Sequence, residues 1–337
     1  MKLTVFKKAA TAILLSGVLL LTACSTGDKT SKETGSNGEE IVYFKYPDNP
    51  SFDLIYLADQ LGYFEGTNTR PQYVGKVAAP QIIPLVGTGD IDFGSRMVPL
   101  VISAIASGAD IKVVSAGGLT LEDAPHMKYF VRKDSGIKEA KDLEGETIGF
   151  NSFGACAEFV TKKWLREQGV DVDTIEWVVV PDDKGEQTVE QGDVDLAIIH
   201  PPHSGRASNN PELTALWSDY DLDKGLGGMA PYSVNGEFAR NHPEAVEDVV
   251  TAITKAANWV NENPDEARKI IAERLGMDIE NVERYAYVKD LVIEEEPIQY
   301  YIDILEDEGK LKEGSVDVKD VYTNEFNPFA NGKTASK

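Results

Sequence analysis

Strand-like and helix-like segments alternate from residue 41 to residue 232, and this alternation constrains the fold more than any other feature. The run 41–46 (IVYFKY) is rich in β-branched and aromatic residues, which is typical of a strand. After a loop that contains proline, Ser51 is placed to cap a helical pattern over 52–64. Such alternation predicts an α/β protein with mostly parallel sheets. Further strands are expected at 72–77, 91–94, 111–116, 129–131, 147–150, 176–180 and 195–199, with helices at 79–86, 99–106 and 156–168.

The pattern changes to helix alone after residue 232. Residues 243–261 form a long amphipathic pattern, Pro264 begins a second helical segment, and 298–308 is a third. A chain of 337 residues is longer than one compact core usually holds, so we expect two lobes.

The first 23 residues have the features of a secretory signal peptide. Lys2, Lys7 and Lys8 give a positively charged start, residues 9–21 are almost wholly apolar, and small residues follow. The apolar segment is shorter than the roughly 20 residues that a membrane span needs.

The run Leu21-Thr22-Ala23-Cys24 resembles the end of a bacterial lipoprotein signal. The resemblance implies that residues 1–23 are removed and that Cys24 carries a lipid such as palmitate, so that the protein is anchored to the cell membrane on its extracytoplasmic side. An ordinary signal peptide with an incidental cysteine is the alternative. Residues 24–40 are small or polar throughout and predict a flexible linker, with the globular part beginning near Ile41.

Composition excludes several classes of partner. The formal net charge is −23, and removing the three leader lysines makes it more negative still, which argues against binding nucleic acid or anionic surfaces. A small anionic ligand remains compatible with this charge. The chain has two cysteines and four histidines, with no HExxH or CxxC motif, so neither a metal site nor a cofactor is expected.

Four short motifs occur in an order that resembles one protein family. They are the helix end at 57–65 (LADQLGYFE), the turn at 85–94 (LVGTGDIDFG), the segment 131–149 containing KDLEGETIG, and the element 191–197 (QGDVDLA). Together they resemble the substrate-binding subunits of ABC importers over about residues 41–260. The most similar group is the binders of sulfonates, taurine, nitrate and thiamine-precursor pyrimidines.

This resemblance implies a type 2 periplasmic-binding-protein fold, with two mixed sheets flanked by helices and a hinge of two crossing strands. Residues 41–131 and 232–337 would form lobe 1, and residues 132–231 would form lobe 2. A small-molecule ligand would bind between the lobes, which close over it. The implied partners are the ABC permease and ATPase subunits, and the implied state is a monomer.

Ligands of parallel α/β sheets bind at the carboxyl ends of strands, near helix N-termini. The loop after the first strand therefore offers Asn49, Ser51 and Phe52, although Ser51 also suits a capping role. The loop after strand 91–94 offers Ser95 and Arg96. A guanidinium at Arg96 suits a sulfonate, carboxylate or phosphate, and a salt bridge is the alternative role.

The loop 151–156 follows another strand and opens a helix. Ser152 and the backbone N–H groups of Gly154 and Ala155 are candidates for an anion nest, and Phe153 for stacking on the ligand. Cys156 is either a reactive thiol at a helix start or a small buried residue. The candidate ligand-binding residues of this loop are Asn151, Ser152, Phe153, Gly154, Ala155 and Cys156.

The loop after strand 195–199 offers His200, and Tyr232 is a further aromatic candidate. Together with Cys156, His200 and His203 raise the alternative of a soft-metal ligand. The favoured ligand is a small organic anion such as a sulfonate, because of Arg96 and the helix N-termini. The aromatic residues equally suit a flat heterocycle such as a thiamine-precursor pyrimidine.

Catalysis has little support in the sequence. Enzymes of thiamine-pyrimidine biosynthesis share the implied fold but carry a cysteine-rich run that this chain lacks. No Ser-His-Asp order, paired-carboxylate motif or phosphate loop is evident. The sequence therefore predicts a binding protein and not an enzyme; a signalling or adhesion lipoprotein on the same fold is a further alternative.

Overall fold

The computed structural model describes residues 35, 38, 40–49, 51–224 and 230–330. The described residues belong to one compact unit. The predicted signal peptide (1–23), the lipidated Cys24 and most of the predicted linker (24–40) lie outside the described residues. Within the described part of the chain, no helix has the length and apolar character to cross a membrane.

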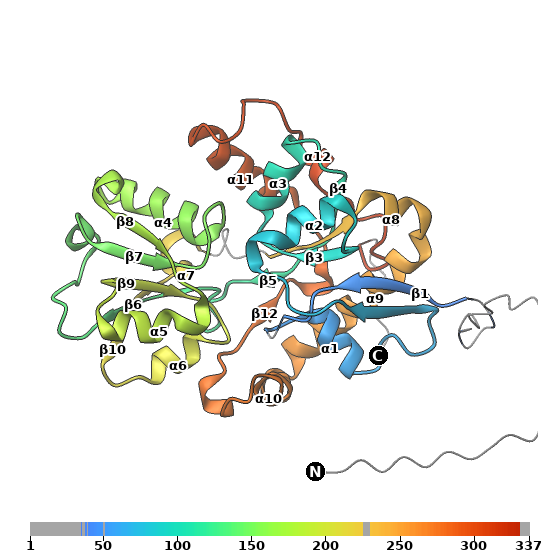
Figure 1. Ribbon diagram of the computed structural model, residues 1–337, viewed down its shortest axis with the longest axis horizontal. Helices are drawn as coiled ribbons and strands as arrows, with labels where there is room; N and C mark the ends of the chain where they lie inside the picture. The colour runs from blue at the N-terminus through green and yellow to red at the C-terminus, as the bar shows by residue number, and fades with distance from the viewer. Residues whose placement is uncertain (1–34, 36–37, 39, 50, 225–229, 331–337) are drawn as a thin grey trace, which may run out of the picture. The chain divides into compact units, whose positions relative to one another are not determined.

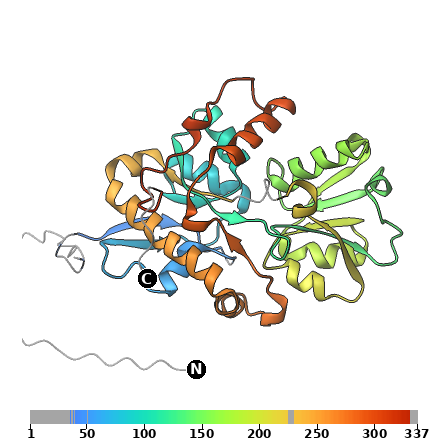
Figure 2. The same ribbon diagram turned by 180° about the vertical axis from the view of Figure 1, so that it is seen from behind.

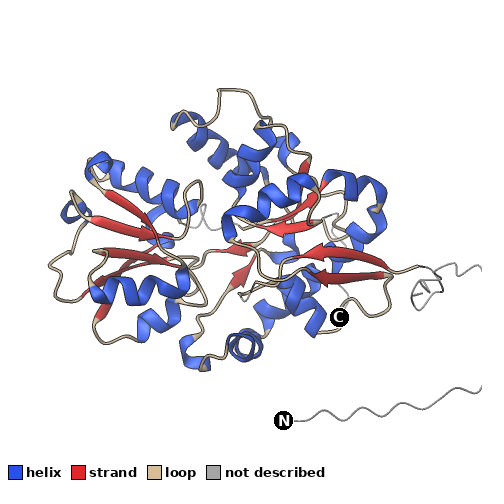
Figure 3. Ribbon diagram, in the orientation of Figure 1, coloured by secondary structure: helices blue, strands red, loops and turns tan. Residues whose placement is uncertain are grey.

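Hydrogen bonding groups the described strands into four sheets (Figures 1 and 3). The strands are β1 (Val42–Tyr46), β2 (Thr69–Tyr73), β3 (Phe93–Ser95), β4 (Ile111–Ser115), β5 (Gly118–Leu119), β6 (Lys128–Arg132), β7 (Thr147–Phe150), β8 (Glu176–Val179), β9 (Leu196–Ile199), β10 (Leu213–Ser218), β11 (Tyr232–Asn235) and β12 (Ala286–Tyr287). A five-stranded sheet has the order β10-β6-β9-β7-β8, and a three-stranded sheet has the order β3-β11-β4. The pairs β1-β2 and β12-β5 complete the set.

The described helices flank these sheets. They are α1 (Leu54–Gln60), α2 (Ile82–Thr88), α3 (Val98–Ala106), α4 (Cys156–Glu167), α5 (Asp182–Gln191), α6 (Ser204–Asn209), α7 (Asp219–Asp223), α8 (Gly236–Asn241), α9 (Pro243–Glu262), α10 (Pro264–Leu275), α11 (Glu295–Asp307) and α12 (Val318–Val321). Short 3₁₀ turns occupy Ala79–Gln81, Ala140–Leu143, Val172–Thr174, Ile279–Asn281 and Lys289–Leu291.

The predicted class, an α/β protein with mixed sheets flanked by helices, is confirmed, but the expectation of mostly parallel sheets is wrong. Strand β7 runs parallel to β8 and β9, because α4 and α5 act as crossovers within this part of the sheet. Strands β6 and β10 lie outside these crossover units and pair antiparallel. Strand β11 is also antiparallel to both of its neighbours.

The start of α1 differs from the prediction that Ser51 caps it. The helix begins at Leu54, so the capping position falls on Asp53, whose carboxylate accepts hydrogen bonds from the N–H groups of Ile55 (2.9 Å) and Tyr56 (3.2 Å). The Ser51 hydroxyl instead donates to the carbonyl of Asn49 at 3.3 Å. Ser51 therefore shapes the loop before the helix.

The long C-terminal helix α9 confirms its predicted amphipathic pattern. It begins at Pro243 as expected and buries one apolar face that includes Val249, Ile253 and Val260. Helix α9 packs beside α1 and β12, which Figures 1 and 2 show from opposite sides. Because α9 contacts both elements, β12 is brought close to α1, from which it is far apart in the sequence.

Candidate functional site

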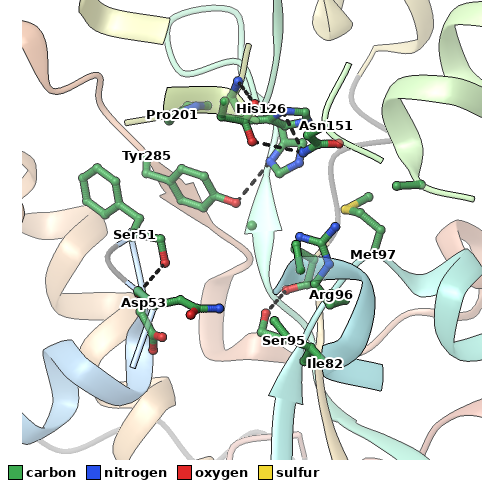
Figure 4. Close-up of a pocket in the computed structure, with 18 of the residues that line it drawn as sticks. Ser51, Asp53, Ile82, Ser95, Arg96, Met97, His126, Asn151, Pro201 and Tyr285 are labelled. Atoms are coloured by element: carbon green, nitrogen blue, oxygen red, sulfur yellow. Dashed lines mark hydrogen bonds and ion pairs between the residues drawn. The ribbon is translucent and has the colours of Figure 1, made fainter. Parts of the chain in front are cut away.

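A cavity of about 270 Å³ lies where several strand ends and helix starts meet (Figure 4). Tyr46 ends β1 and Ser95 ends β3, while Asn151 directly follows β7 and His200 directly follows β9. All four line the cavity. The convergence of loops at the carboxyl ends of strands is the arrangement that the sequence predicted.

Arg96 brings a positive charge to this cavity. One terminal guanidinium nitrogen donates to the Ser152 hydroxyl at 3.2 Å, and the buried Nε has no hydrogen-bond partner among the described residues. Burial lowers the pKa of Arg96, while the charges of Cys156 and Asp182 oppose this effect. Within the described chain no carboxylate forms an ion pair with Arg96, so its charge is available to an anion.

A polar cluster lines one part of the cavity; it consists of His126, Asn151, Cys156, Asp182 and His200. The ring Nδ1 of His200 lies 2.8 Å from a carboxylate oxygen of Asp182, and its Nε2 lies 3.7 Å from the Cys156 sulfur. The Asn151 amide donates to the same carboxylate at 3.1 Å. Cys156 and Asp182 begin helices α4 and α5, so two helix N-termini meet here.

Charge and burial fix the protonation of this cluster. Burial acts to lower the pKa of His200, but the charge of Asp182 and the hydrogen bond to it outweigh burial and raise that pKa to about 10. Burial acts to raise the pKa of Asp182, and the positive His200 outweighs it, so the pKa falls to about 2. Without another ligand, His200 and Asp182 form an ion pair.

His126 stands beside this pair in a different state. Burial, together with the positive charge of His200, lowers the pKa of His126 to about 3, so its imidazole is neutral. Its Nδ1 lies 3.1 Å from the hydroxyl of Tyr285, and Figure 4 shows that hydroxyl directed at the ring. The rings of His126 and His200 meet edge to face, with centroids 4.9 Å apart.

An aromatic cluster lines another part of the cavity; it consists of Phe52, Tyr232, Tyr285 and Tyr287. The rings of Phe52 and Tyr285 are stacked at 5.4 Å, and those of Tyr285 and Tyr287 are 5.0 Å apart. The hydroxyl of Tyr232 accepts a hydrogen bond from the N–H of Leu54 at 2.8 Å. This cluster offers flat apolar area with a few hydroxyl groups.

Comparison with known proteins identifies the family. Residues 49–267, more than half of the chain, match the family described as NMT1/THI5 like. This chain belongs to the NMT1/THI5-like family. A relative from Brucella abortus, named as a binding protein without a stated ligand, is 24% identical over 208 residues, which cover 61% of this chain and 62% of that protein. The chain therefore spans less than two thirds of that relative.

Two further relatives differ in what they are named for. The 4-amino-5-hydroxymethyl-2-methylpyrimidine phosphate synthase of Legionella pneumophila is 24% identical over 237 residues, covering 67% of this chain and 70% of the enzyme. The periplasmic aliphatic sulphonate binding protein SsuA of Escherichia coli is similar in structure, with a TM-score of 0.65 at 20% identity over 83% of this chain and 90% of SsuA. The second likeness confirms a periplasmic-binding-protein type 2 fold.

Most of the residues predicted for the site of this NMT1/THI5-like chain line the cavity. These are Asn49, Ser51, Phe52, Ser95, Arg96, Asn151, Ala155, Cys156, His200 and Tyr232. Whether they bind a ligand stays a prediction.

Three residues of the predicted anion-nest loop do not line the cavity. Ser152 is buried and holds Arg96. Phe153 is 54% exposed and packs its ring against Phe150 at 4.8 Å. Gly154 has a φ of 78°, which suits glycine, and its N–H donates to the Glu158 carboxylate at 2.7 Å. That N–H is therefore already satisfied within the protein.

Sequence reasoning missed several residues of the cavity of this NMT1/THI5-like protein. Asp182 begins the helix after β8. The expectation that ligands bind at the carboxyl ends of strands, which predicted Asn151 and His200, therefore also applies to Asp182. Asp53, the observed helix cap, lines the cavity as well. Other lining residues, among them His126, Tyr285 and Tyr287, have no local sequence signal.

Proposed function

We propose that this protein is the solute-binding component of an ABC importer and that its cavity takes a small organic anion such as a sulfonate. The observation that carries the proposal is Arg96, a cavity-lining cation with a buried, unpartnered Nε and no carboxylate partner among the described residues. The likeness to SsuA, which is named for aliphatic sulfonates, supports the same class of ligand.

The proposal includes the location and the partners. Cys24 carries the lipid, the linker 24–40 tethers the protein to the extracytoplasmic face of the membrane, and a monomer delivers its solute to the permease and ATPase. Residues 41–131 with 232–337 and residues 132–231 act as two lobes that close over the solute. The protein releases the solute chemically unchanged.

The aromatic cluster supports a second candidate ligand. Stacked Phe52 and Tyr285 suit a flat heterocycle, and the Legionella relative is named for making a pyrimidine phosphate. A thiamine-precursor pyrimidine is therefore the alternative solute, and a biosynthetic enzyme is the alternative activity.

A calorimetric titration with short alkanesulfonates and with a hydroxymethylpyrimidine tests these candidates. We expect Arg96→Ala to weaken sulfonate binding by roughly 10- to 100-fold, because a charge-assisted hydrogen bond contributes about 1.5–3 kcal/mol. The matched control is Arg240→Ala, which removes an exposed arginine paired with Asp110 and should leave affinity unchanged. Equal sulfonate affinity in Arg96→Ala and wild type would contradict the anion proposal, and conversion of the solute would favour the enzyme.

A further inference from the structure

Three buried side chains of the polar cluster bring metal-ligating atoms together. One donor atom from each of His126, Cys156 and His200 lies within 4.8 Å of the other two. The three come from a loop, a helix start and a strand end, spread over residues 126–200. These three residues follow neither the HExxH nor the CxxC spacing, so no motif in the sequence marks the set.

The spacing of the Cys156 and His200 donor atoms suits one tetrahedral ion. Zinc–sulfur and zinc–nitrogen bonds of about 2.3 and 2.0–2.1 Å place sulfur and nitrogen ligands about 3.6 Å apart. The Cys156 sulfur lies 3.7 Å from Nε2 of His200. One thiolate and two imidazoles form a donor set typical of zinc and of other borderline or soft transition-metal ions.

The surroundings already orient the two imidazoles. Metal-bound histidines usually donate their second ring N–H to a carboxylate or another acceptor, which fixes the ring. His200 directs Nδ1 at the Asp182 carboxylate at 2.8 Å and leaves Nε2 facing Cys156. His126 contacts the Tyr285 hydroxyl through Nδ1 at 3.1 Å, which leaves its Nε2 for the ion.

Three protein ligands leave one tetrahedral position open, as in zinc sites that accept a further ligand. All three residues line the cavity, as do Arg96 and Asp182. The charges of a divalent cation, the Cys156 thiolate, the Asp182 carboxylate and the Arg96 guanidinium add up to one net positive charge. An anionic donor is therefore the favoured fourth ligand.

We propose that His126, Cys156 and His200 bind one zinc-class transition-metal ion, whose open position faces the cavity and receives a donor atom of the solute. The metal site depends only on the positions of its three ligand residues, whereas the role of the open position rests on the proposed solute-binding function. When bound to the ion, Cys156 is a thiolate and Nε2 of His200 carries no proton; any proton displaced on binding passes to the solvent.

The test uses the full chain carrying Cys24→Ser, because Cys24 is the only other cysteine. Chelator-treated protein is titrated with Zn²⁺ without solute, and the Co²⁺ complex is examined by absorption spectroscopy. We expect one Zn²⁺ per chain and a thiolate-to-cobalt charge-transfer band. Cys156→Ser should abolish the band, and His126→Ala should sharply weaken Zn²⁺ binding.

Asp182→Asn keeps all three ligands and should weaken Zn²⁺ binding by roughly 10- to 100-fold, the usual effect of losing a partner of a metal-bound histidine. The control His242→Ala removes an exposed histidine outside the cavity and should change nothing. Circular dichroism verifies that each variant folds. If a ligand variant does not fold, His126→Gln is measured in its place.

The metal site is overturned if wild type binds no stoichiometric Zn²⁺, or if Cys156→Ser and His126→Ala bind it as wild type does. Rapid alkylation of Cys156 that saturating Zn²⁺ does not slow would also overturn it, and would mark Cys156, His200 and Asp182 as a thiol nucleophile with its base. Solute binding is measured separately on chelator-treated protein. Failure of the metal site and failure of the proposed function are therefore separate results.

Discussion

The polar and aromatic clusters face the same cavity but are held in different ways. His200, Asp182 and Asn151 are linked by hydrogen bonds, so each fixes the orientation of the next. The aromatic rings are held mainly by packing, and the buried hydroxyl of Tyr287 has no hydrogen-bond partner among the described residues. The hydrogen bonds thus organise the polar cluster before a ligand arrives, and each cluster keeps one buried polar atom for the ligand to satisfy: Oδ1 of Asn151 in the polar cluster and the Tyr287 hydroxyl in the aromatic cluster.

The largest effect should come from breaking the ion pair of the polar cluster. Asp182→Asn leaves the buried His200 without its carboxylate and should lower the free energy of unfolding by about 2–3 kcal/mol. Urea unfolding at neutral pH measures this change. Asp183→Asn, at an exposed neighbouring position, is the matched control and should cost only a few tenths of a kcal/mol. Similar losses in the two variants would contradict the idea of a pre-organised cluster.

The next effect concerns the segment that carries His126. Asp219 is buried and accepts hydrogen bonds from the Thr120 hydroxyl and the N–H of Met127, on either side of His126. Burial raises the pKa of Asp219 to about 6, although both hydrogen bonds oppose this shift.

Because the folded-state pKa of Asp219 lies above the unfolded value of about 3.9, the folded state binds this proton more tightly. The resulting stabilisation is complete below about pH 4 and is lost as the pH rises through about 6. Asp219→Asn should remove this dependence, changing the difference in unfolding free energy between pH 4 and pH 8 by on the order of 2 kcal/mol. Urea unfolding at both pH values tests it, with the exposed Asp134→Asn as control. An unchanged pH profile would contradict the assignment.

The two clusters also differ in how far the sequence predicts them. Asn151 and His200 were predicted because strands β7 and β9 have clear local patterns, and side chains that follow parallel strands meet at one edge. Asp182 follows the same rule, because it begins the helix after β8. Tyr285 and Tyr287 carry no such signal, because β12 pairs with β5 from a segment more than 160 residues earlier.

The errors in the fold have the same origin. Helix and strand positions follow from local periodicity: β7 has the predicted bounds, and α10 begins at the predicted Pro264. Strand direction in β6, β10 and β11 depends on how long connections return to a sheet, which residue spacing does not encode. The capping error at Ser51 arose because Ser51 and Asp53 are both good helix caps two residues apart, so that the local sequence does not choose between them.

A smaller effect should follow from Tyr232, which joins the aromatic cluster to the start of α1. Tyr232→Phe removes the acceptor of the Leu54 N–H and leaves that buried donor unpaired, which should lower stability by about 1 kcal/mol. The control Tyr322→Phe removes a hydroxyl that bonds Glu295 at an exposed site and should have little effect. Thermal unfolding of the two variants beside wild type measures the difference; equal shifts would show that the buried bond contributes nothing.

The smallest effects should separate two neighbouring tyrosines of the aromatic cluster. Tyr285→Phe removes the contact with His126 and should cost about 0.5–1 kcal/mol of stability, whereas Tyr287→Phe removes an unpartnered hydroxyl and should be neutral or slightly stabilising. If the solute uses the Tyr287 hydroxyl, Tyr287→Phe should nevertheless weaken its binding by roughly 2- to 10-fold. Unfolding and calorimetric titration of both variants give the two readouts. A Tyr287→Phe protein with lower stability but unchanged affinity would reverse the distinction between the clusters, because the aromatic cluster would then be the one organised without its ligand.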